Sequence, residues 1–159
     1  MPTPQSRKPR VFVDADVLFA GAAAPTEHGA SLTVLRMAEI TLIEAVTSQQ
    51  AVVEAERNLE AKLPAAPPAA LPAFRLIVSR CLRVTADPVP ADLTSHVGRA
   101  DPADLPLLVA ALREGCPWLV TFNMRHYRPG HPEVTVLRPG DLILRVRDLL
   151  AGLASQGIL

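Results

Sequence analysis

Short runs of apolar residues alternate along the chain with longer stretches in which apolar residues recur every three or four positions. The short runs predict strands and the longer stretches predict amphipathic helices, since each element must bury one face. Strands are predicted at 10–13, 40–46, 82–85, 118–121 and 134–137. Helices are predicted at 17–24, 31–39, 73–81, 101–114 and 139–150, with one more after Ser48 as N-cap. This alternation predicts a three-layer α/β/α fold around a parallel sheet.

The length of 159 residues predicts a single domain at 10–150, between a flexible basic lead at 1–9 and a tail at 151–159. No apolar run approaches the ~20 residues of a membrane helix, and the N-terminal region lacks the apolar core of a signal peptide. We therefore expect a cytoplasmic protein without a membrane segment. Cys81 and Cys116 form no metal-binding spacing and are interpreted as buried reduced thiols.

The overall charge gives no sign of an extended nucleic-acid surface. The net charge is +0, and aromatic residues make up only 4% of the chain. A protein that holds RNA stably usually has a basic face or an aromatic platform for the bases. An enzyme that contacts a few phosphates locally needs neither, so this class of function stays open.

The first apolar run ends in an acidic residue. Asp14 follows Val11-Phe-Val directly, and Asp16 comes after one small residue. Ligands of open α/β sheets bind beyond the carboxyl ends of the strands, which makes Asp14 a candidate site residue. The alternative is that Asp14 only caps the helix that follows.

Other oxygen-bearing side chains fall where a parallel sheet would bring them to the same edge. Glu54 lies early in the helix after the second strand, and Asn123 follows the fourth strand. Asp101 and Asp104 open the helix between them. Gathered carboxylates raise each other's pKa, and Mg²⁺ or Mn²⁺ relieves that repulsion. Taken singly, each is explained as a solvated helix charge, an N-cap or a turn residue, but together they predict a divalent-metal site.

Four segments in this order resemble the PIN-domain family, the small ribonucleases that include the toxins of VapBC toxin–antitoxin pairs. They are Val11-Phe-Val-Asp-Ala-Asp-Val-Leu18, Ser48-Gln-Gln-Ala-Val-Val-Glu54, Asp101-Pro-Ala-Asp-Leu-Pro-Leu-Leu-Val-Ala-Ala-Leu112 and Leu119-Val-Thr-Phe-Asn123. Pro139-Gly-Asp-Leu closes the pattern, as in many members. The resemblance spans nearly the whole chain and implies a sheet of about five parallel strands with a divalent-metal site.

The resemblance also implies roles for individual residues. Asp14, Glu54 and Asp104 match the family's first three acidic positions, which makes them the expected catalytic residues and ligands of Mg²⁺ or Mn²⁺. Asp16 stands where a residue that supports the first acid is usual. Thr121 matches a hydroxyl residue that is common before the fourth position.

The fourth acidic position holds Asn123, where many members have aspartate. An amide oxygen can still join the metal site but carries no charge, so we expect weaker metal binding, with substrate phosphate completing the site. Asp101 lies one helical turn from Asp104 and partly compensates, or it is only the N-cap of the helix. A loss of catalysis is the alternative that Asn123 raises.

Arg125, His126 and Arg128 follow Asn123 closely. Beside a metal site the two arginines would bind RNA phosphates, because guanidinium groups form bidentate contacts with them. The alternative is a solvated loop. His126 has no partner in the sequence that would make it an acid or a base.

Three functional hypotheses follow from these patterns. The first is a metal-dependent endoribonuclease, the toxin of a toxin–antitoxin pair, with RNA as substrate, a small antitoxin as partner and a homodimer as its assembly. The apolar helix at 31–38 then serves as a contact surface or as core. The second is a PIN-like module that binds protein or RNA without catalysis. The third is a phosphatase of the haloacid-dehalogenase type, which Asp14-Ala-Asp16 suggests but for which Lys8 and Lys62 are poorly placed.

Overall fold

A sheet of five parallel strands forms the centre of the protein, in a computed structural model that describes residues 8–23, 29–62 and 68–157. Its strand order is β3-β2-β1-β4-β5, and every neighbouring pair is parallel. The strands are β1 (Arg10–Val13), β2 (Glu44–Ser48), β3 (Leu82–Thr85), β4 (Trp118–Val120) and β5 (Thr135–Leu137). The order reverses at β1, so a switch point lies between β1 and β4, where α/β sheets bind their ligands.

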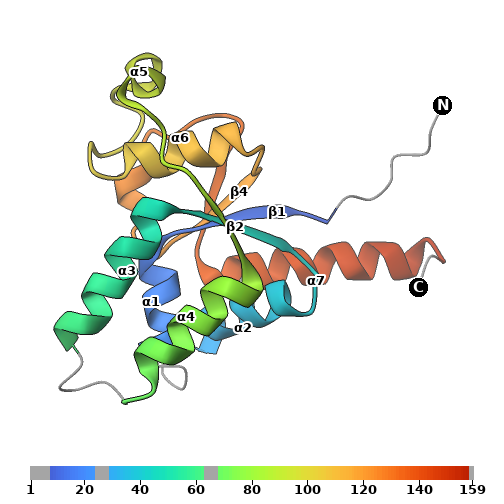
Figure 1. Cartoon of the computed structure of the whole chain (residues 1–159). Coiled ribbons are helices and arrows are strands. Elements are labelled where there is room, and N and C mark those ends of the chain that lie inside the picture. The colour runs from blue at the N-terminus through green and yellow to red at the C-terminus, as the bar shows by residue number, and fades with distance from the viewer. Residues whose placement is uncertain (1–7, 24–28, 63–67, 158–159) are drawn as a thin grey trace.

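Helices cover both faces of this sheet, which confirms the predicted three-layer fold. They are α1 (Ala15–Ala23), α2 (Gly29–Glu39), α3 (Gln49–Lys62), α4 (Ala70–Cys81), α5 (Pro90–Leu93), α6 (Leu105–Arg113) and α7 (Pro139–Ser155), with 3₁₀ turns η1 (Thr94–His96) and η2 (Met124–Tyr127). Figure 1 shows α6 on one side of the sheet and α1, α2 and α7 on the other. Within the described residues, no helix combines the length and apolar character needed to cross a membrane.

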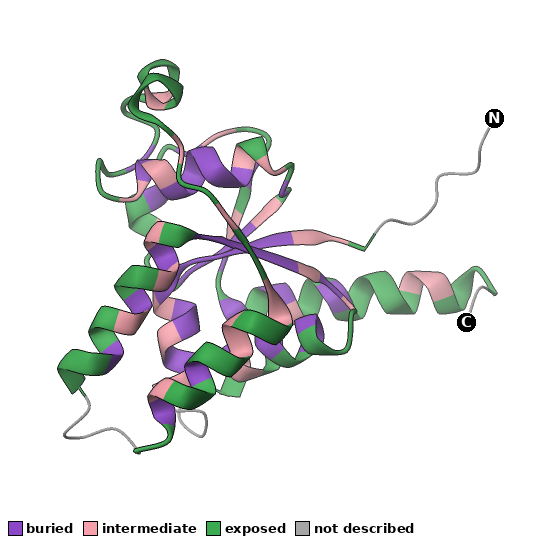
Figure 2. Cartoon of the chain, in the orientation of Figure 1, coloured by how far each residue is buried: buried purple, intermediate pink, exposed green. Residues whose placement is uncertain are grey.

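The middle strand is the most deeply buried part of the sheet. Val11, Phe12 and Val13 are all fully buried, and Figure 2 shows the buried residues concentrated along the strands and the inner helix faces. A parallel sheet is covered on both faces, so its strands are apolar on both sides. This explains why an uninterrupted apolar run encodes β1.

The second strand starts later than predicted. Ile40 is exposed, Thr41 has a φ of 64°, and the backbone N–H of Leu42 donates to the carbonyl of Met37. These residues end α2 and reverse the chain, although their side chains are typical of strands. The prediction of a strand at 40–46 was therefore wrong at its start, and Glu44 is the first residue of β2 instead of lying near its end.

Helices α1, α2 and α4 begin two or three residues before their predicted starts, and the bounds of α6 and α7 differ by more. Helix α6 begins at Leu105 and not at 101, because the residues before it form turns. Its end is as predicted: Gly115 has a φ of 66° and its N–H donates to the carbonyl of Leu112. Helix α7 continues to Ser155, five residues beyond the predicted end at 150.

Both cysteines are free thiols, but they differ in burial. Cys116 is buried, and burial raises the pKa of its thiol to about 12, which keeps it protonated. Cys81 is only partly buried. The prediction of two buried thiols is confirmed for Cys116 alone.

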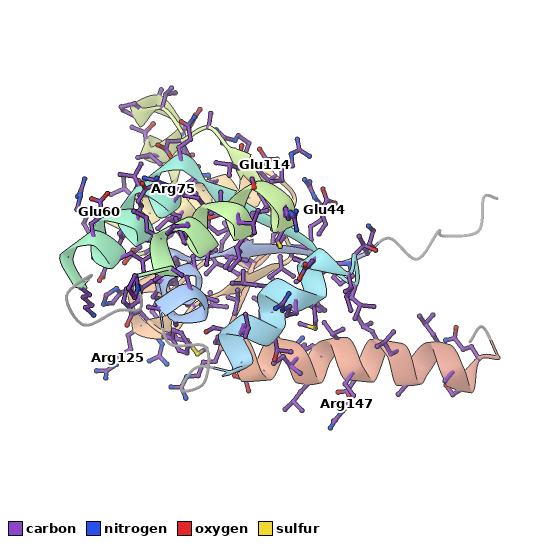
Figure 3. All side chains as sticks on the ribbon, turned by 60° about the horizontal axis from the view of Figure 1, so that its bottom comes forward. Glu44, Glu60, Arg75, Glu114, Arg125 and Arg147 are labelled. Carbon is purple, nitrogen blue, oxygen red and sulfur yellow. The ribbon has the colours of Figure 1, made fainter. Side chains whose placement is uncertain are left out.

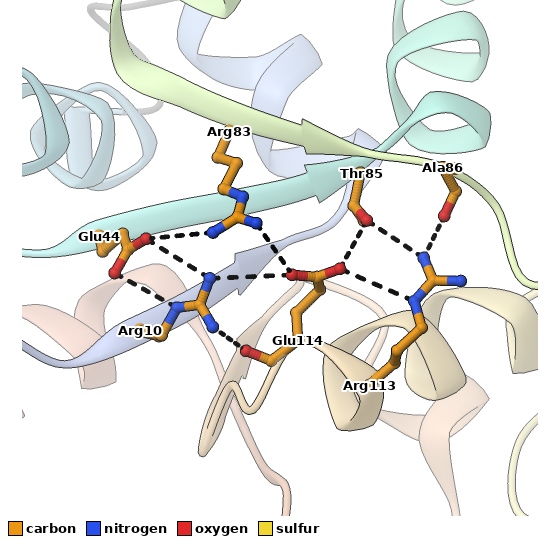
Figure 4. Close-up of polar contacts among 7 residues, drawn as sticks. All are labelled: Arg10, Glu44, Arg83, Thr85, Ala86, Arg113 and Glu114. Carbon is orange, nitrogen blue, oxygen red and sulfur yellow. Dashed lines mark hydrogen bonds and ion pairs between the residues drawn. The ribbon is translucent and has the colours of Figure 1, made fainter.

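A network of charged side chains ties the end of α6 to the first three strands (Figure 4). Its centre is Glu114, whose carboxylate accepts a hydrogen bond from the Thr85 hydroxyl at 2.6 Å. The same carboxylate lies 3.8 Å from the guanidinium of Arg10 and 3.9 Å from that of Arg83. Arg10 also pairs with Glu44 at 3.2 Å. Charge pairs thus take the place of an apolar layer at this corner of the sheet.

Candidate metal centre

Asp14 stands directly after the middle strand, at the carboxyl edge of the sheet. Its backbone N–H donates to the carbonyl of Val120, which fixes it against β4. One carboxylate oxygen accepts hydrogen bonds from the Thr121 hydroxyl at 2.9 Å and the Tyr127 hydroxyl at 2.7 Å. The other accepts the N–H of Ala15 at 2.6 Å. The side chain is held rigidly and is only 6% exposed, so it is more than a cap for α1.

Asp16 links the start of α1 to the segment after β4. Its Oδ2 accepts hydrogen bonds from the backbone N–H of Phe122 at 2.9 Å and from the Thr121 hydroxyl at 3.2 Å. Its other oxygen is buried and has no hydrogen-bond partner among the described residues. Burial and then the charge of Asp14 raise the pKa of Asp16 to about 6. Thr121 therefore stands between two carboxylates.

Glu54, in α3, and Asp104, directly before α6, complete the acidic group. Ser48 caps the helix that carries Glu54, since its hydroxyl accepts the N–H of Ala51 at 3.3 Å, as predicted. Burial, followed by the charge of Asp14, raises the pKa of both Glu54 and Asp104, and Asp104 raises that of Glu54 further. The two also line one groove of about 850 Å³. The fold has brought three carboxylates close enough to disfavour one another's charged forms.

His126 contacts this group, which the sequence did not indicate. Its Nδ1 lies 2.9 Å from Asp104 Oδ2, and its Nε2 lies 3.9 Å from Asp101 Oδ2. One potential ligand atom from each of these three residues lies within 4.8 Å of the others. The predicted N-cap role of Asp101 was wrong: Asp104 occupies that position, and no side chain forms a cap hydrogen bond there.

Asn123 lies at the rim of the site. Its backbone N–H donates to Thr121 Oγ1 at 3.0 Å, and its carbonyl accepts the N–H of His126, which starts the turn η2. The residue is exposed and lines a cavity of about 600 Å³ together with Arg125 and Arg128. The structure therefore places both predicted phosphate-binding arginines beside the fourth site position.

Tyr127 is the residue that sequence reasoning missed most completely. It is the only tyrosine in the chain and lies among the charged residues that follow Asn123. Burial, then the charge of Asp14, raises the pKa of its phenol, so the hydroxyl stays neutral and remains a donor to Asp14. The signal in the sequence that could have indicated this residue was a single aromatic side chain within a polar segment.

The donor set fits a hard divalent cation. Burial and then the charge of Asp14 raise the pKa of Glu54 and Asp104, so a cation between the three carboxylates would relieve this repulsion. Asp16 also has a buried oxygen without a hydrogen-bond partner among the described residues. The lysine required by the phosphatase alternative is missing from this edge. Lys62 packs over the ring of Phe19 at 4.7 Å, and Lys8 precedes β1 at the opposite edge.

An open parallel sheet with carboxylates gathered at its switch point defines a class of small α/β proteins with an acidic, cation-compatible site. Within that class, a family model described as the PIN domain matches residues 10–125. The chain belongs to the PIN-domain family, as its motifs predicted, and members of this family are typically metal-dependent nucleases. No curated protein matches the chain significantly.

Solved structures with the same fold come from both archaea and bacteria. The protein PAE2754 from Pyrobaculum aerophilum is 17% identical, with a TM-score of 0.61, and the match covers 90% of this chain and 98% of that one. VapBC2 from Rickettsia felis, bound to a DNA fragment from its promoter, is 13% identical with a TM-score of 0.58 and coverage of 81% and 98%. VapC20 from Mycobacterium tuberculosis, a toxin that cleaves the sarcin-ricin loop, is 19% identical with a TM-score of 0.51 and coverage of 69% and 86%.

Proposed function

We propose that this protein is a metal-dependent endoribonuclease that hydrolyses RNA phosphodiesters. One observation carries the proposal: Asp14, Glu54 and Asp104 meet at the switch point of the sheet, where burial and then the charge of Asp14 raise the pKa of Glu54 and of Asp104. A protein gathers such charges at a cost in stability, and an enzyme that binds a divalent cation recovers this cost when the cation is bound. Membership of a family of nucleases supports the same activity.

Asp14 and Asp104 are the main ligands of Mg²⁺ or Mn²⁺ in this proposal, and Glu54 completes the shell or orients water. When bound, the ion supplies positive charge for the phosphate oxygens and makes water a better nucleophile. The hydroxyls of Thr121 and Tyr127 hold the Asp14 carboxylate in a fixed orientation. Asn123 offers an uncharged oxygen at the rim, where the substrate phosphate supplies further negative charge.

The biological setting that we propose is a toxin–antitoxin pair in the cytoplasm. Two proteins with the same fold are a VapBC complex and a VapC toxin, which supports RNA as the substrate and a small antitoxin as the partner. A homodimer is the proposed assembly. Cleavage of RNA in the presence of the ion, and its suppression by the antitoxin, is the activity expected of such a toxin.

Incubation of the purified protein with structured and unstructured RNAs tests the activity directly. Cleavage is expected in Mn²⁺ or Mg²⁺ and is expected to stop in excess EDTA, because the carboxylates alone cannot neutralise the charge that builds up on the phosphate. A thermal melt in each buffer shows that the protein is folded. A folded protein that leaves every RNA intact with both ions would contradict the proposal.

Replacement of Asn123 by aspartate is expected to strengthen divalent-metal binding by on the order of tenfold, because it adds a negative charge at the edge of the site. Isothermal titration calorimetry with Mn²⁺ measures the change. Gln156→Glu adds the same charge at the far end of α7 and is expected to leave the affinity unchanged. Equal affinities for Asn123→Asp and wild type would show that position 123 does not take part in the metal site.

The exposed Asn123 also favours a second candidate function, a PIN-like module that binds RNA or protein without catalysis. In that case the site lacks one charge that a catalytic site in this family commonly has. Tight binding of RNA or a partner protein without turnover in Mn²⁺ or Mg²⁺ is expected of such a module. Metal-dependent turnover excludes it.

A further inference from the structure

A second cavity adjoins the acidic group on the side of Asn123. It has a volume of about 600 Å³, and its charged lining consists of Arg125, Arg128, Arg138, Asp101 and His126. Arg125 lies within the turn η2 and Arg128 directly follows it, whereas Arg138 directly precedes α7 and is distant in sequence. Figure 3 shows Arg125 extending away from the body of the protein. Two segments therefore contribute arginines to a single cavity.

These three arginines differ from most others in the chain because their guanidinium groups are unpaired. None forms an ion pair or hydrogen bond with another residue in the part of the chain that the structure describes. Elsewhere, arginines do pair with glutamates, as Arg36 does with Glu39 and Arg75 with Glu56, both at 2.6 Å. The net charge of zero thus conceals a local excess of positive charge, three guanidinium groups against the one carboxylate of Asp101.

The residue at position 123 strengthens this excess. Asn123 lines the cavity without adding a charge, whereas an aspartate there would neutralise part of the arginine charge. His126 lines the same cavity and contacts Asp104, so the arginine cavity and the acidic group share a wall. An anion in the cavity would therefore lie beside the carboxylates. Guanidinium groups bind phosphate through parallel hydrogen bonds, which makes phosphate the anion that suits a cavity lined by three arginines.

We propose that this cavity binds a backbone phosphate of the RNA next to the scissile phosphodiester, with Arg138 completing the set begun by Arg125 and Arg128. The inference rests on the proposed ribonuclease function and adds a subsite to it. The cavity anchors the strand on one side of the acidic group, since the neighbouring phosphate is held on the η2 side. A substrate must therefore carry a phosphate on that side of the cleaved bond.

Binding of a fluorescently labelled single-stranded oligoribonucleotide in EDTA tests this subsite separately from catalysis. Arg138→Ala is expected to weaken binding roughly fivefold to tenfold and to lower the slope of log K against log salt by about one, because one phosphate contact is lost. Arg138→Lys keeps the charge but loses the planar fork, and an intermediate affinity is expected. The matched control is Arg145→Ala, within α7. Arg145 is exposed and lies outside the cavity lining.

The outcomes separate this inference from the ribonuclease proposal. Equal affinities and salt slopes for Arg138→Ala and Arg145→Ala would overturn the subsite, even if the wild type cleaves RNA. Binding that depends on Arg138 without cleavage in any divalent ion would support the subsite and contradict the nuclease. Failure of the wild type to bind the oligonucleotide, with binding of an acidic protein that Arg138→Ala abolishes, would overturn the subsite in favour of a protein partner.

Discussion

Replacement of Asp14 by asparagine is expected to lower metal-dependent RNA cleavage by about 10³-fold, which corresponds to several kcal/mol of lost charge stabilisation in the transition state. Asp14 is the carboxylate whose charge raises the pKa of Asp16, Glu54 and Asp104, so it lies nearest to the place where a cation would relieve all of them. Removal of its charge weakens both ion binding and the stabilisation of the phosphate. Single-turnover cleavage at saturating Mn²⁺ measures the loss.

The fold of this variant is expected to persist, so the loss can be assigned to chemistry. An amide oxygen still accepts the hydrogen bonds from Thr121 and Tyr127, and the side chain keeps its volume. The amide nitrogen cannot accept the N–H of Ala15, so one hydrogen bond is lost, and a thermal melt checks that the variant is folded. The control is Asp148→Asn, the same chemical change at a side chain within α7 that is 70% exposed. This variant is expected to cleave RNA at the wild-type rate. An Asp14→Asn variant that is folded and fully active would refute the assigned metal site.

Replacement of Glu114 by alanine is expected to lower the free energy of unfolding by about 2 kcal/mol at neutral pH. Its side chain is only 14% exposed and joins Thr85 to the guanidinium groups of Arg10 and Arg83, as Figure 4 shows. Truncation leaves the two guanidinium groups facing one another without the carboxylate between them and removes the acceptor of the Thr85 hydroxyl, in a partly buried network. Urea denaturation of the variant and the wild type at about pH 7 measures the difference.

The stability that Glu114 contributes is expected to depend on pH, and its pKa gives the direction of that change. The hydrogen bond from Thr85, more than the nearby arginines, holds the pKa of Glu114 below its usual range. A carboxyl with a lowered pKa in the folded state stabilises the protein above its unfolded pKa, and that stabilisation is lost as the pH falls through the folded value. The difference in stability between the two proteins should therefore shrink as the pH falls below the usual pKa range of a glutamate carboxyl. The control is Glu133→Ala, at a side chain that is 80% exposed, which should change the free energy of unfolding by less than about 0.5 kcal/mol. An equally small change in the free energy of unfolding for Glu114→Ala would refute the role of the network.

The sequence predicted the sheet better than the loops because burial leaves a local signal. The middle strand is an apolar run that ends in an acid, and β1 and β3 have their predicted bounds. The start of β2 was wrong because Ile40 and Thr41 have strand-like side chains but form the turn that ends α2. In that turn tertiary structure overrides propensity, and no single-sequence pattern reports it.

The same reasoning explains which site residues could be found. Asp14 and Asp16 follow a strand, and Thr121 follows another, so topology alone places them together. Tyr127, His126 and Arg138 lie in irregular segments, and their positions depend on how the turn η2 folds back toward Asp14 and Asp104. Such long-range contacts have no periodicity, and only the folded chain shows that a tyrosine in a polar stretch is buried against a carboxylate.

The placement of the first strand in the middle of the sheet has a consequence for synthesis on the ribosome. Asp14 is synthesised 113 residues before its Tyr127 donor, and β4 must pair with β1 before the carboxylate is fixed. Contacts so distant in sequence form late. A nascent chain therefore displays its acids without an assembled site, and the nuclease activity that we propose would begin only after β4 and η2 have been synthesised.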